Sequence, residues 1–398
     1  MYVSTEELVE TMGVRYLNNL IGDKCKSALT VKHLDTYANK TIVIDTSIYI
    51  YQFLGQNALM ENMYLMMAQF KLHNITPIFV FDGAAPQEKR HTIQNRESSR
   101  KWAELNYIEA SAKLTNLRRR HDSQDSHDSH DSQNNDAGVT VDFGNTADDT
   151  GNAVSEIIDT ESAIYELRKQ CVRVRGCEVL DVKRLMRAFD MRYIDADGES
   201  DNMCAQIVKL GIAHACMSND MDMLLYGCPR VLRHFNISQE TVIEYDLYRI
   251  LEILDVTICE FREICILSGT DYNPNNFEPS IRHRIYLSGI FESYYRFRKS
   301  AEYGTSTFYE WIKNISWLFR RIDVQALQRV HEIFSIELTK EQLENISGVL
   351  QKNAPAQITT LSVNVVHPIR SSAAASISTF EIPARVKRIM AQYNFIYI

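Results

Sequence analysis

Four short runs of large apolar residues, each ending next to an acidic side chain, constrain the fold of this sequence more than any other feature. The runs are TIVIDTS (41–47), TPIFVFDG (76–83), RYIDA (192–196) and IAHACMSND (212–220). Stretches with helical periodicity, such as ALMENMYLMMAQFKLH and SDNMCAQIVKLG, lie between them. Apolar strands that alternate with helices are typical of a sheet covered on both faces. The sequence therefore predicts an α/β fold with a doubly wound, mainly parallel sheet.

The acids that follow these runs are expected to meet at one edge of the sheet. In an open parallel sheet, the ligand crevice lies outside the carboxyl ends of the strands. Each acid alone has an ordinary explanation, because Asp after a strand is a good turn former or helix N-cap. Seven acids in the same topological place indicate more than a set of turns. They are Asp45, Asp82, Glu199, Asp201, Asp220, Asp222 and Asp271, the last of which follows the helical stretch TICEFREICILSG.

Seven carboxylates so close together need cations. Like charges raise one another's pKa and destabilise the fold unless positive charge neutralises them. Hard oxygen ligands, without His or Cys among them, favour Mg²⁺ or Mn²⁺ over Zn²⁺. Two such ions form the clamp that assists in-line displacement at phosphorus. The sequence therefore predicts two Mg²⁺ ions, replaceable by Mn²⁺, and a phosphodiester substrate.

A basic stretch follows Asp82 directly. The segment PQEKRHTIQNRESSRKW is predicted to enter a helix at Pro86, and its spacing places Lys89, Arg96 and Arg100 on one face. Such a face can hold a phosphate and stabilise its developing charge. An ordinary solvated helix face is the alternative interpretation.

One segment accounts for the acidic balance of the chain. Residues 121–158, which begin HDSQDSHDSHDSQNND, are poor in large apolar groups and are predicted to be a disordered insert. A metal-binding His/Asp tract is the alternative interpretation. Of the 51 acidic residues, eleven lie in 121–162, whereas none of the 43 basic residues does. The net charge of −8 therefore becomes +3 without residues 121–162, which suits a nucleic-acid partner.

Compartment signals are few. No run of about 18 apolar residues is present, and the first residues, MYVSTEELVETMG, lack the layout of a signal peptide. Eight cysteines without any CxxC suit free thiols in a reducing compartment and give no zinc signature. We expect a soluble intracellular protein, nuclear or cytoplasmic, that does not contact a membrane.

Taken in order, these motifs resemble the flap endonuclease and XPG-type branch of the structure-specific 5′ nucleases, which have a PIN-like fold. The likeness runs from MGVRYLNNLI (12–21) through TIVIDTSIYIYQFL, PIFVFDGAAPQEK, YIDADGESDNMCAQIVKLG and CMSNDMDMLLYGCPRVLRHF to ICILSGTDY, about half the chain. The resemblance implies that the seven acids bind the metal ions. It also implies that Lys89 and Arg96 contact the scissile phosphate at the base of a helical arch, and that Tyr51 stacks on a base.

The same resemblance implies a Mg²⁺-dependent nuclease that cleaves branched or 5′-flapped DNA in replication, repair or recombination and leaves 5′-phosphates. A 5′-to-3′ exonuclease of the same family and a catalytically silent scaffold that binds nucleic acid are the alternatives. Ser200 and Asp201 stand in a Glu-Ser-Asp sequence where the family has Glu-x-Glu. Diverged members with shortened motifs occur in large DNA viruses, and this chain is similar to them.

The resemblance also divides the chain and leaves part of it unassigned. The family's Gly-rich helix-hairpin-helix is absent from NPNNFEPSIRHRIYLSGIF, where Arg282 and Arg284 can replace it electrostatically. The final YNFIYI does not fit the Gln-led sliding-clamp peptide, so clamp binding is not expected. The expected segments are a nuclease region with the start of the arch (12–110), the insert (121–158), a second nuclease region (160–272), a helical DNA-binding region (273–353) and a segment of unassigned role (354–398).

Overall fold

The computed structural model describes residues 13–128, 146–273, 287–300, 308–314, 323–352, 382–393 and 395. The chain forms two compact units, and each is described separately. Unit 1 consists of Met1–Thr92 and Val174–Ile398, and unit 2 consists of Ile93–Arg173.

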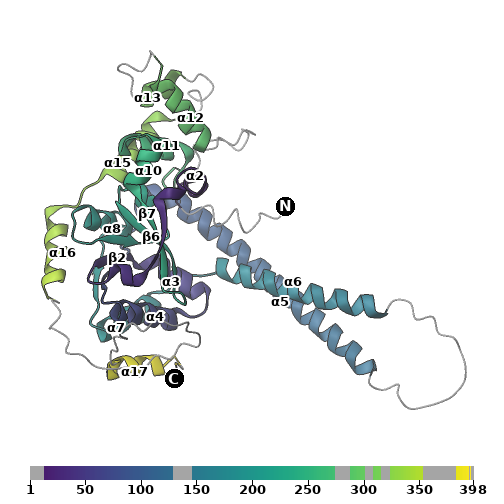
Figure 1. Cartoon of the computed structure of the whole chain (residues 1–398). Coiled ribbons are helices and arrows are strands. Elements are labelled where there is room, and N and C mark those ends of the chain that lie inside the picture. Colours follow the sequence, from purple (N-terminus) through teal and green to yellow (C-terminus); the bar gives the residue numbers. More distant parts are fainter. Residues whose placement is uncertain are drawn as a thin grey trace, which may run out of the picture. The chain divides into compact units, whose positions relative to one another are not determined.

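Unit 1 is built on a seven-stranded sheet (Figure 1) with the strand order β1-β7-β6-β5-β2-β3-β4. Strands β6, β5, β2, β3 and β4 pair in parallel with one another, whereas β7 is antiparallel to both β6 and β1. The predicted mainly parallel sheet is therefore confirmed. The strands are β1 (Leu29–His33), β2 (Thr41–Asp45), β3 (Thr76–Phe81), β4 (Arg192–Asp195), β5 (Ala215–Met217), β6 (Arg230–Asn236) and β7 (Thr241–Asp246).

Helices cover both faces of this sheet because successive strand residues point to opposite sides. In β2, Val43 belongs to one apolar core, while Ile42 and Ile44 belong to the other. The first core contains residues of α2 (Leu17–Lys24), α8 (Ser200–Lys209), α9 (Asp222–Leu225), α10 (Leu247–Leu254) and α11 (Ile258–Ser268). The second core contains residues of α3 (Thr46–Gly55), α4 (Leu59–Leu72), α7 (Gly176–Ala188) and α17 (Ala384–Ala391). The predicted doubly wound architecture is confirmed.

The described part of the predicted helical region 273–353 is helical. Its helices are α12 (Leu287–Arg298), α13 (Phe308–Asn314), α15 (Val324–Ser335) and α16 (Lys340–Lys352). Arg282 and Arg284 lie outside the described residues. Within the described ranges, no helix combines the length and the apolar character needed to cross a bilayer.

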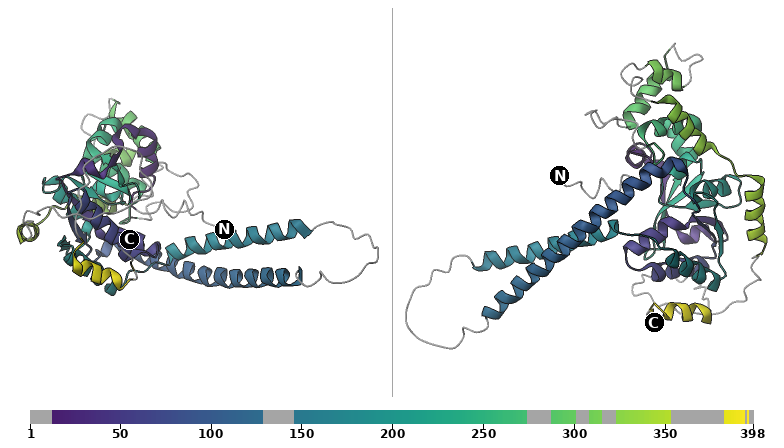
Figure 2. Two further views of the ribbon diagram at one scale, coloured as in Figure 1. Left: turned by 60° about the horizontal axis from the view of Figure 1, so that its bottom comes forward. Right: turned by 180° about the vertical axis from the view of Figure 1, so that it is seen from behind.

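Unit 2 contains most of α5 (Arg90–Asp128) together with α6 (Thr146–Gln170), two long helices that lie side by side (Figure 2). Ion pairs join them, Lys113 to Glu156 at 2.8 Å and Arg118 to Glu161 at 2.6 Å. The helix predicted to begin after Pro86 is therefore present, preceded by a 3₁₀ turn at Gln87–Lys89.

The predicted disordered insert is partly wrong. Residues 121–128 continue α5 and residues 146–158 belong to α6, whereas residues 129–145 lie outside the described residues. A helix that has already nucleated adds one hydrogen bond for each further residue, so it can extend through a polar sequence that would not nucleate a helix itself. The compact units also divide the chain at Ile93 and Arg173, inside the predicted segments 12–110 and 160–272.

Candidate metal centre

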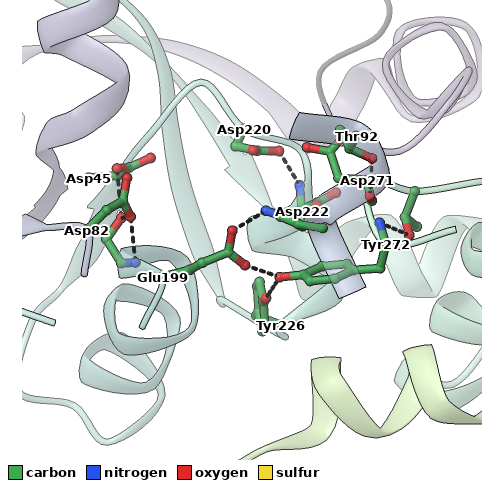
Figure 3. A network of polar contacts seen from close by, with 12 residues as sticks. Asp45, Asp82, Thr92, Glu199, Asp220, Asp222, Tyr226, Asp271 and Tyr272 are labelled. Carbon is green, nitrogen blue, oxygen red and sulfur yellow. Dashed lines mark hydrogen bonds and ion pairs between the residues drawn. The ribbon is translucent and has the colours of Figure 1, made fainter. Parts of the chain in front are cut away.

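Six of the seven predicted acids lie at or just after the carboxyl ends of four neighbouring parallel strands, in the order β5-β2-β3-β4. Asp45 is the last residue of β2, Asp82 follows β3, and Asp220 and Asp222 follow β5. Glu199 and Asp201 follow β4 at the start of α8, and Asp271 follows α11. Figure 3 shows Asp45, Asp82, Glu199, Asp220, Asp222 and Asp271 of this set in one region. We call the seven acids the carboxylate floor.

The Asp45 end of the floor is organised by serine hydroxyls. Ser200 Oγ lies 3.0 Å from Asp45 Oδ1 and 2.7 Å from Asp82 Oδ1, and the Ser200 N–H donates to Asp82 Oδ1 at 2.8 Å. Ser218 Oγ donates to Asp45 Oδ2 at 2.9 Å. Burial, followed by the charge of Asp82, raises the pKa of Asp45 to about 7 even though both hydroxyls favour its charged form.

Asp220 and Asp222 form the next part of the floor. The Asp222 N–H donates to Asp220 Oδ1 at 2.9 Å, and the Asp220 N–H donates to Ser218 Oγ at 3.1 Å. Asp222 is completely buried, and neither of its carboxylate oxygens has a hydrogen-bond partner among the described residues. Burial and the charges of Asp220 and Asp271 raise the pKa of Asp222 well above its usual range. A buried, unpartnered carboxylate of this kind requires a cation or a proton.

The electrostatic couplings run along the whole floor. Asp201 is buried, and burial together with the charges of Asp45 and Asp220 raises its pKa well above the usual range. Asp201 thus interacts with the Asp45 end and with Asp220, whereas Asp222 interacts with Asp220, Asp271 and Glu199. The acids therefore form two overlapping groups that meet at Asp220.

Lys89 is the buried cation beside these acids. Its Nζ lies 2.6 Å from Glu199 Oε1 and 4.7 Å from the centre of the Tyr272 ring. Burial alone would lower the pKa of Lys89, but the charges of Asp201, Glu199 and Asp222 outweigh it and raise the pKa. Among the predicted cationic residues, Lys89 therefore lies within the floor itself.

Two tyrosines and two serines of this site were not among the predicted residues. The Tyr272 hydroxyl donates to Glu199 Oε2 and lies 2.6 Å from the Tyr226 hydroxyl, as Figure 3 shows. Tyr272 follows Asp271 in the sequence TDY, and Ser200 separates the two acids of ESD. These tyrosines and serines stand close in the sequence to predicted metal ligands, and this proximity was the sequence signal that could have identified them.

Two glycines allow the backbone to approach this edge. Gly13 has a φ of +81°, and a Cβ there would lie 2.6 Å from Asp220 Oδ1 and 3.1 Å from Asp222 Oδ1. A Cβ at Gly83 would lie 2.1 Å from the Ala196 carbonyl oxygen, because the β3 and β4 loops are in direct contact. Both positions therefore require glycine for space, and Gly13 also requires it for backbone conformation.

The other predicted contacts lie elsewhere in the described chain. Tyr51 lies on α3 and is 46% exposed. Arg96 is exposed and Arg100 half-buried, and both lie on α5 within unit 2. The proposed roles of these three residues in DNA binding stay predictions.

Two domain families match the chain. The XPG N-terminal domain matches residues 12–103, and the XPG I-region matches residues 190–271. Together these ranges contain all seven acids of the floor and Lys89.

Individual proteins are also similar to the chain. The chain is 28% identical over 316 residues to the protein named "Probable RAD2-like endonuclease 369L" of Invertebrate iridescent virus 6, covering 71% of this chain and 70% of that protein. It is 27% identical over 280 residues to flap endonuclease 1-A of Sorghum bicolor, covering 66% of this chain and 62% of that protein. The solved flap endonuclease-1 of Methanococcus jannaschii is 18% identical, with a TM-score of 0.47 and coverage of 92% of this chain and 95% of that one. On the two domain matches and the two sequence relatives from the virus and from Sorghum bicolor, the chain belongs to the XPG and flap endonuclease family of nucleases.

Proposed function

We propose that this protein is a Mg²⁺-dependent, structure-specific 5′ nuclease that hydrolyses phosphodiester bonds at junctions of single- and double-stranded DNA. The observation that carries the proposal is the buried, unpartnered carboxylate of Asp222 within the floor. A set of seven hard oxygen donors fits Mg²⁺, and Mn²⁺ can replace it. The relatives named as flap endonucleases support the choice of substrate.

The two overlapping groups of acids favour two ions. Asp45, Asp82 and Asp201 would hold one, and Asp220, Asp222 and Asp271 would hold the other. When bound, these ions would polarise the phosphate and lower the pKa of a water molecule so that it can attack. Glu199 forms an ion pair with Lys89 and could also bind an ion, so it can serve either role.

The protein's own contribution is to hold and orient the phosphate. Lys89 supplies a buried positive charge at the floor, and a fixed charge in a site shielded from water stabilises developing negative charge more strongly than one in solution. Tyr272 limits the movement of Lys89 through its ring and orients Glu199 through its hydroxyl. Ser200 and Ser218 orient Asp45 and Asp82 in the same way.

Asp222→Asn tests the proposal directly. It preserves the shape of the side chain but removes a charge from the floor, which should cost several kcal/mol of transition-state stabilisation. We expect kcat/KM on a 5′-flap substrate with Mg²⁺ to fall by at least about 100-fold. Nicked, blunt and single-stranded substrates in the same assay separate flap cleavage from stepwise 5′-to-3′ digestion.

Asp195→Asn is the matched control for this experiment. Asp195 also ends a parallel strand, β4, but its side chain is 59% exposed and pairs with Lys183 at 2.5 Å instead of joining the floor. We expect this variant to cleave like the wild type. Equal activity in wild type and Asp222→Asn, or no cleavage of any substrate by the wild type, would refute the nuclease assignment.

A further inference from the structure

A second group of metal-ligating side chains lies outside the carboxylate floor, where β1, α4 and the β6–β7 turn meet. It consists of His33, the last residue of β1, His73, which follows α4, and Glu240, which precedes β7. All three residues belong to unit 1. Their ligand atoms lie within 4.8 Å of one another.

The ligand atoms of this group converge on one point. Nε2 of His73 lies 2.9 Å from Glu240 Oε2, and Nε2 of His33 lies 3.5 Å from the same oxygen. The two imidazole rings are 5.2 Å apart and nearly perpendicular. Zn–N and Zn–O bonds of about 2.0–2.1 Å in a tetrahedral arrangement place ligand atoms about 3.3 Å apart. Both measured distances to the carboxylate oxygen are therefore close to those of a zinc site before any side chain moves.

The backbone around the group is already fixed. The Leu34 N–H donates to the Glu240 carbonyl oxygen at 2.9 Å, and the Gln69 side-chain amide donates to the Ile237 carbonyl oxygen. These bonds attach the β6–β7 turn to β1 on one side and to α4 on the other. A metal bound here would not have to order a loop.

The ring of His33 has a second partner on the side away from Glu240. Asp35 Oδ1 lies 3.2 Å from His33 Nδ1, and the Asp35 backbone N–H donates to the same nitrogen at 3.4 Å. A metal on Nε2 would place the ring proton on Nδ1, where it can be donated to the Asp35 carboxylate. A carboxylate in this position commonly orients a metal-bound histidine and increases its basicity.

We propose that His33, His73 and Glu240 form a binding site for a borderline divalent transition-metal ion, Zn²⁺ first among them, that is separate from the carboxylate floor. Two imidazole nitrogens select against Mg²⁺, which prefers oxygen ligands. With three protein ligands and His33 43% exposed, water completes the coordination. The bound ion cross-links β1, α4 and the β6–β7 turn, and it raises the thermal stability of the protein.

Zinc binding by the full-length protein in excess Mg²⁺ tests this site, because Mg²⁺ occupies hard oxygen sites without competing for imidazoles. We expect about one equivalent of Zn²⁺ to bind in equilibrium dialysis and to raise the melting temperature. His73→Ala should abolish both effects. Asp35→Asn, which leaves the three ligands in place, should weaken zinc binding by about 10- to 100-fold.

A matched control is provided by the other compact group in the described chain, Cys259, Glu263 and His331, in which Cys259 Sγ lies 3.6 Å from His331 Nε2. Cys259→Ser should leave zinc binding unchanged. If His73→Ala fails to fold, Glu240→Gln provides the same test with the side-chain shape preserved. The proposal is overturned if the wild type binds no zinc under these conditions, or if zinc binding survives His73→Ala or, where that variant does not fold, Glu240→Gln. Loss of zinc binding in Cys259→Ser would also overturn it.

Discussion

Replacing Asp45 by asparagine should stabilise the metal-free protein, and the gain should grow with pH. Burial and the nearby charge of Asp82 raise the pKa of the Asp45 side chain from 3.8 to about 7. The folded protein therefore holds this proton more tightly than the unfolded chain does. The contribution of the Asp45 proton to the free energy of unfolding is therefore fully present below the pKa of the unfolded chain. This contribution is lost as the pH rises through the folded pKa of about 7, and above that pH it does not change further.

The size of the effect follows from the difference between the two pKa values. A shift of about three units corresponds to about 4 kcal/mol in the free energy of unfolding, since one unit is worth about 1.4 kcal/mol. Roughly 3 kcal/mol of this loss falls between pH 5 and pH 8. Asparagine carries no charge, so Asp45→Asn should escape the loss. Any change in its hydrogen bonds with Ser200 and Ser218 adds an offset that does not depend on pH.

Urea denaturation of wild type and Asp45→Asn at pH 5 and pH 8, with a chelator present, measures this difference. We expect the stability difference between the two proteins to increase by about 3 kcal/mol from the lower to the higher pH. Asp195→Asn, at an exposed strand end, should show no such increase. A difference that is the same at both pH values would refute the claim that burial and the charge of Asp82 raise the pKa of Asp45.

Further substitutions test other contacts of the site. Lys89→Met should lower kcat on a 5′ flap by about 10²–10³-fold, because it removes a buried charge that would face the phosphate. Added Mg²⁺ should restore the melting temperature of this variant but not its cleavage rate. Gly13→Ala should abolish Mg²⁺-dependent cleavage, because the new Cβ would lie 2.6 Å from a carboxylate oxygen of the floor. Gly22→Ala on α2, where a Cβ meets nothing within 4 Å, should remain active and gain up to about 1 kcal/mol in stability. Tyr272→Phe retains the ring over the lysine but loses the hydrogen bond to Glu199, and denaturation should show a loss of about 1.5–3 kcal/mol.

The sheet and its acids were predictable because the responsible signals are local in the sequence. The runs that became β2, β3, β4 and β5 are short and apolar, and an acid stands at or near the end of each. Neighbouring parallel strands end at the same edge of the sheet, so these acids come together whatever conformation the connecting loops adopt. The edge strand β1 was not predicted from the sequence because it contains no apolar run. Of its five residues, only Leu29 and Lys32 are partly buried.

Contacts between distant loops could not be predicted in the same way. Lys89 and Glu199 are 110 positions apart, and Tyr272 reaches Glu199 across 73 positions. Nothing in the sequence around Lys89 indicates whether it faces solvent or the floor. For residues 121–128 and 146–158, composition indicated disorder, yet they are parts of long helices whose neighbouring turns are joined by ion pairs.

Lys89 connects the electrostatics of the floor with the proposed chemistry. In the metal-free protein, burial raises the pKa of both Asp201 and Asp222, the charge of Lys89 partly opposes that rise, and acids of the floor raise the pKa of the lysine in return. The ammonium group is therefore the internal counterion of the floor. A divalent ion would compete for the same carboxylates with twice the charge, so its binding would weaken the attraction that holds Lys89 to Glu199. The lysine would then be available to a phosphate, and its loss should be more harmful to catalysis than to metal binding.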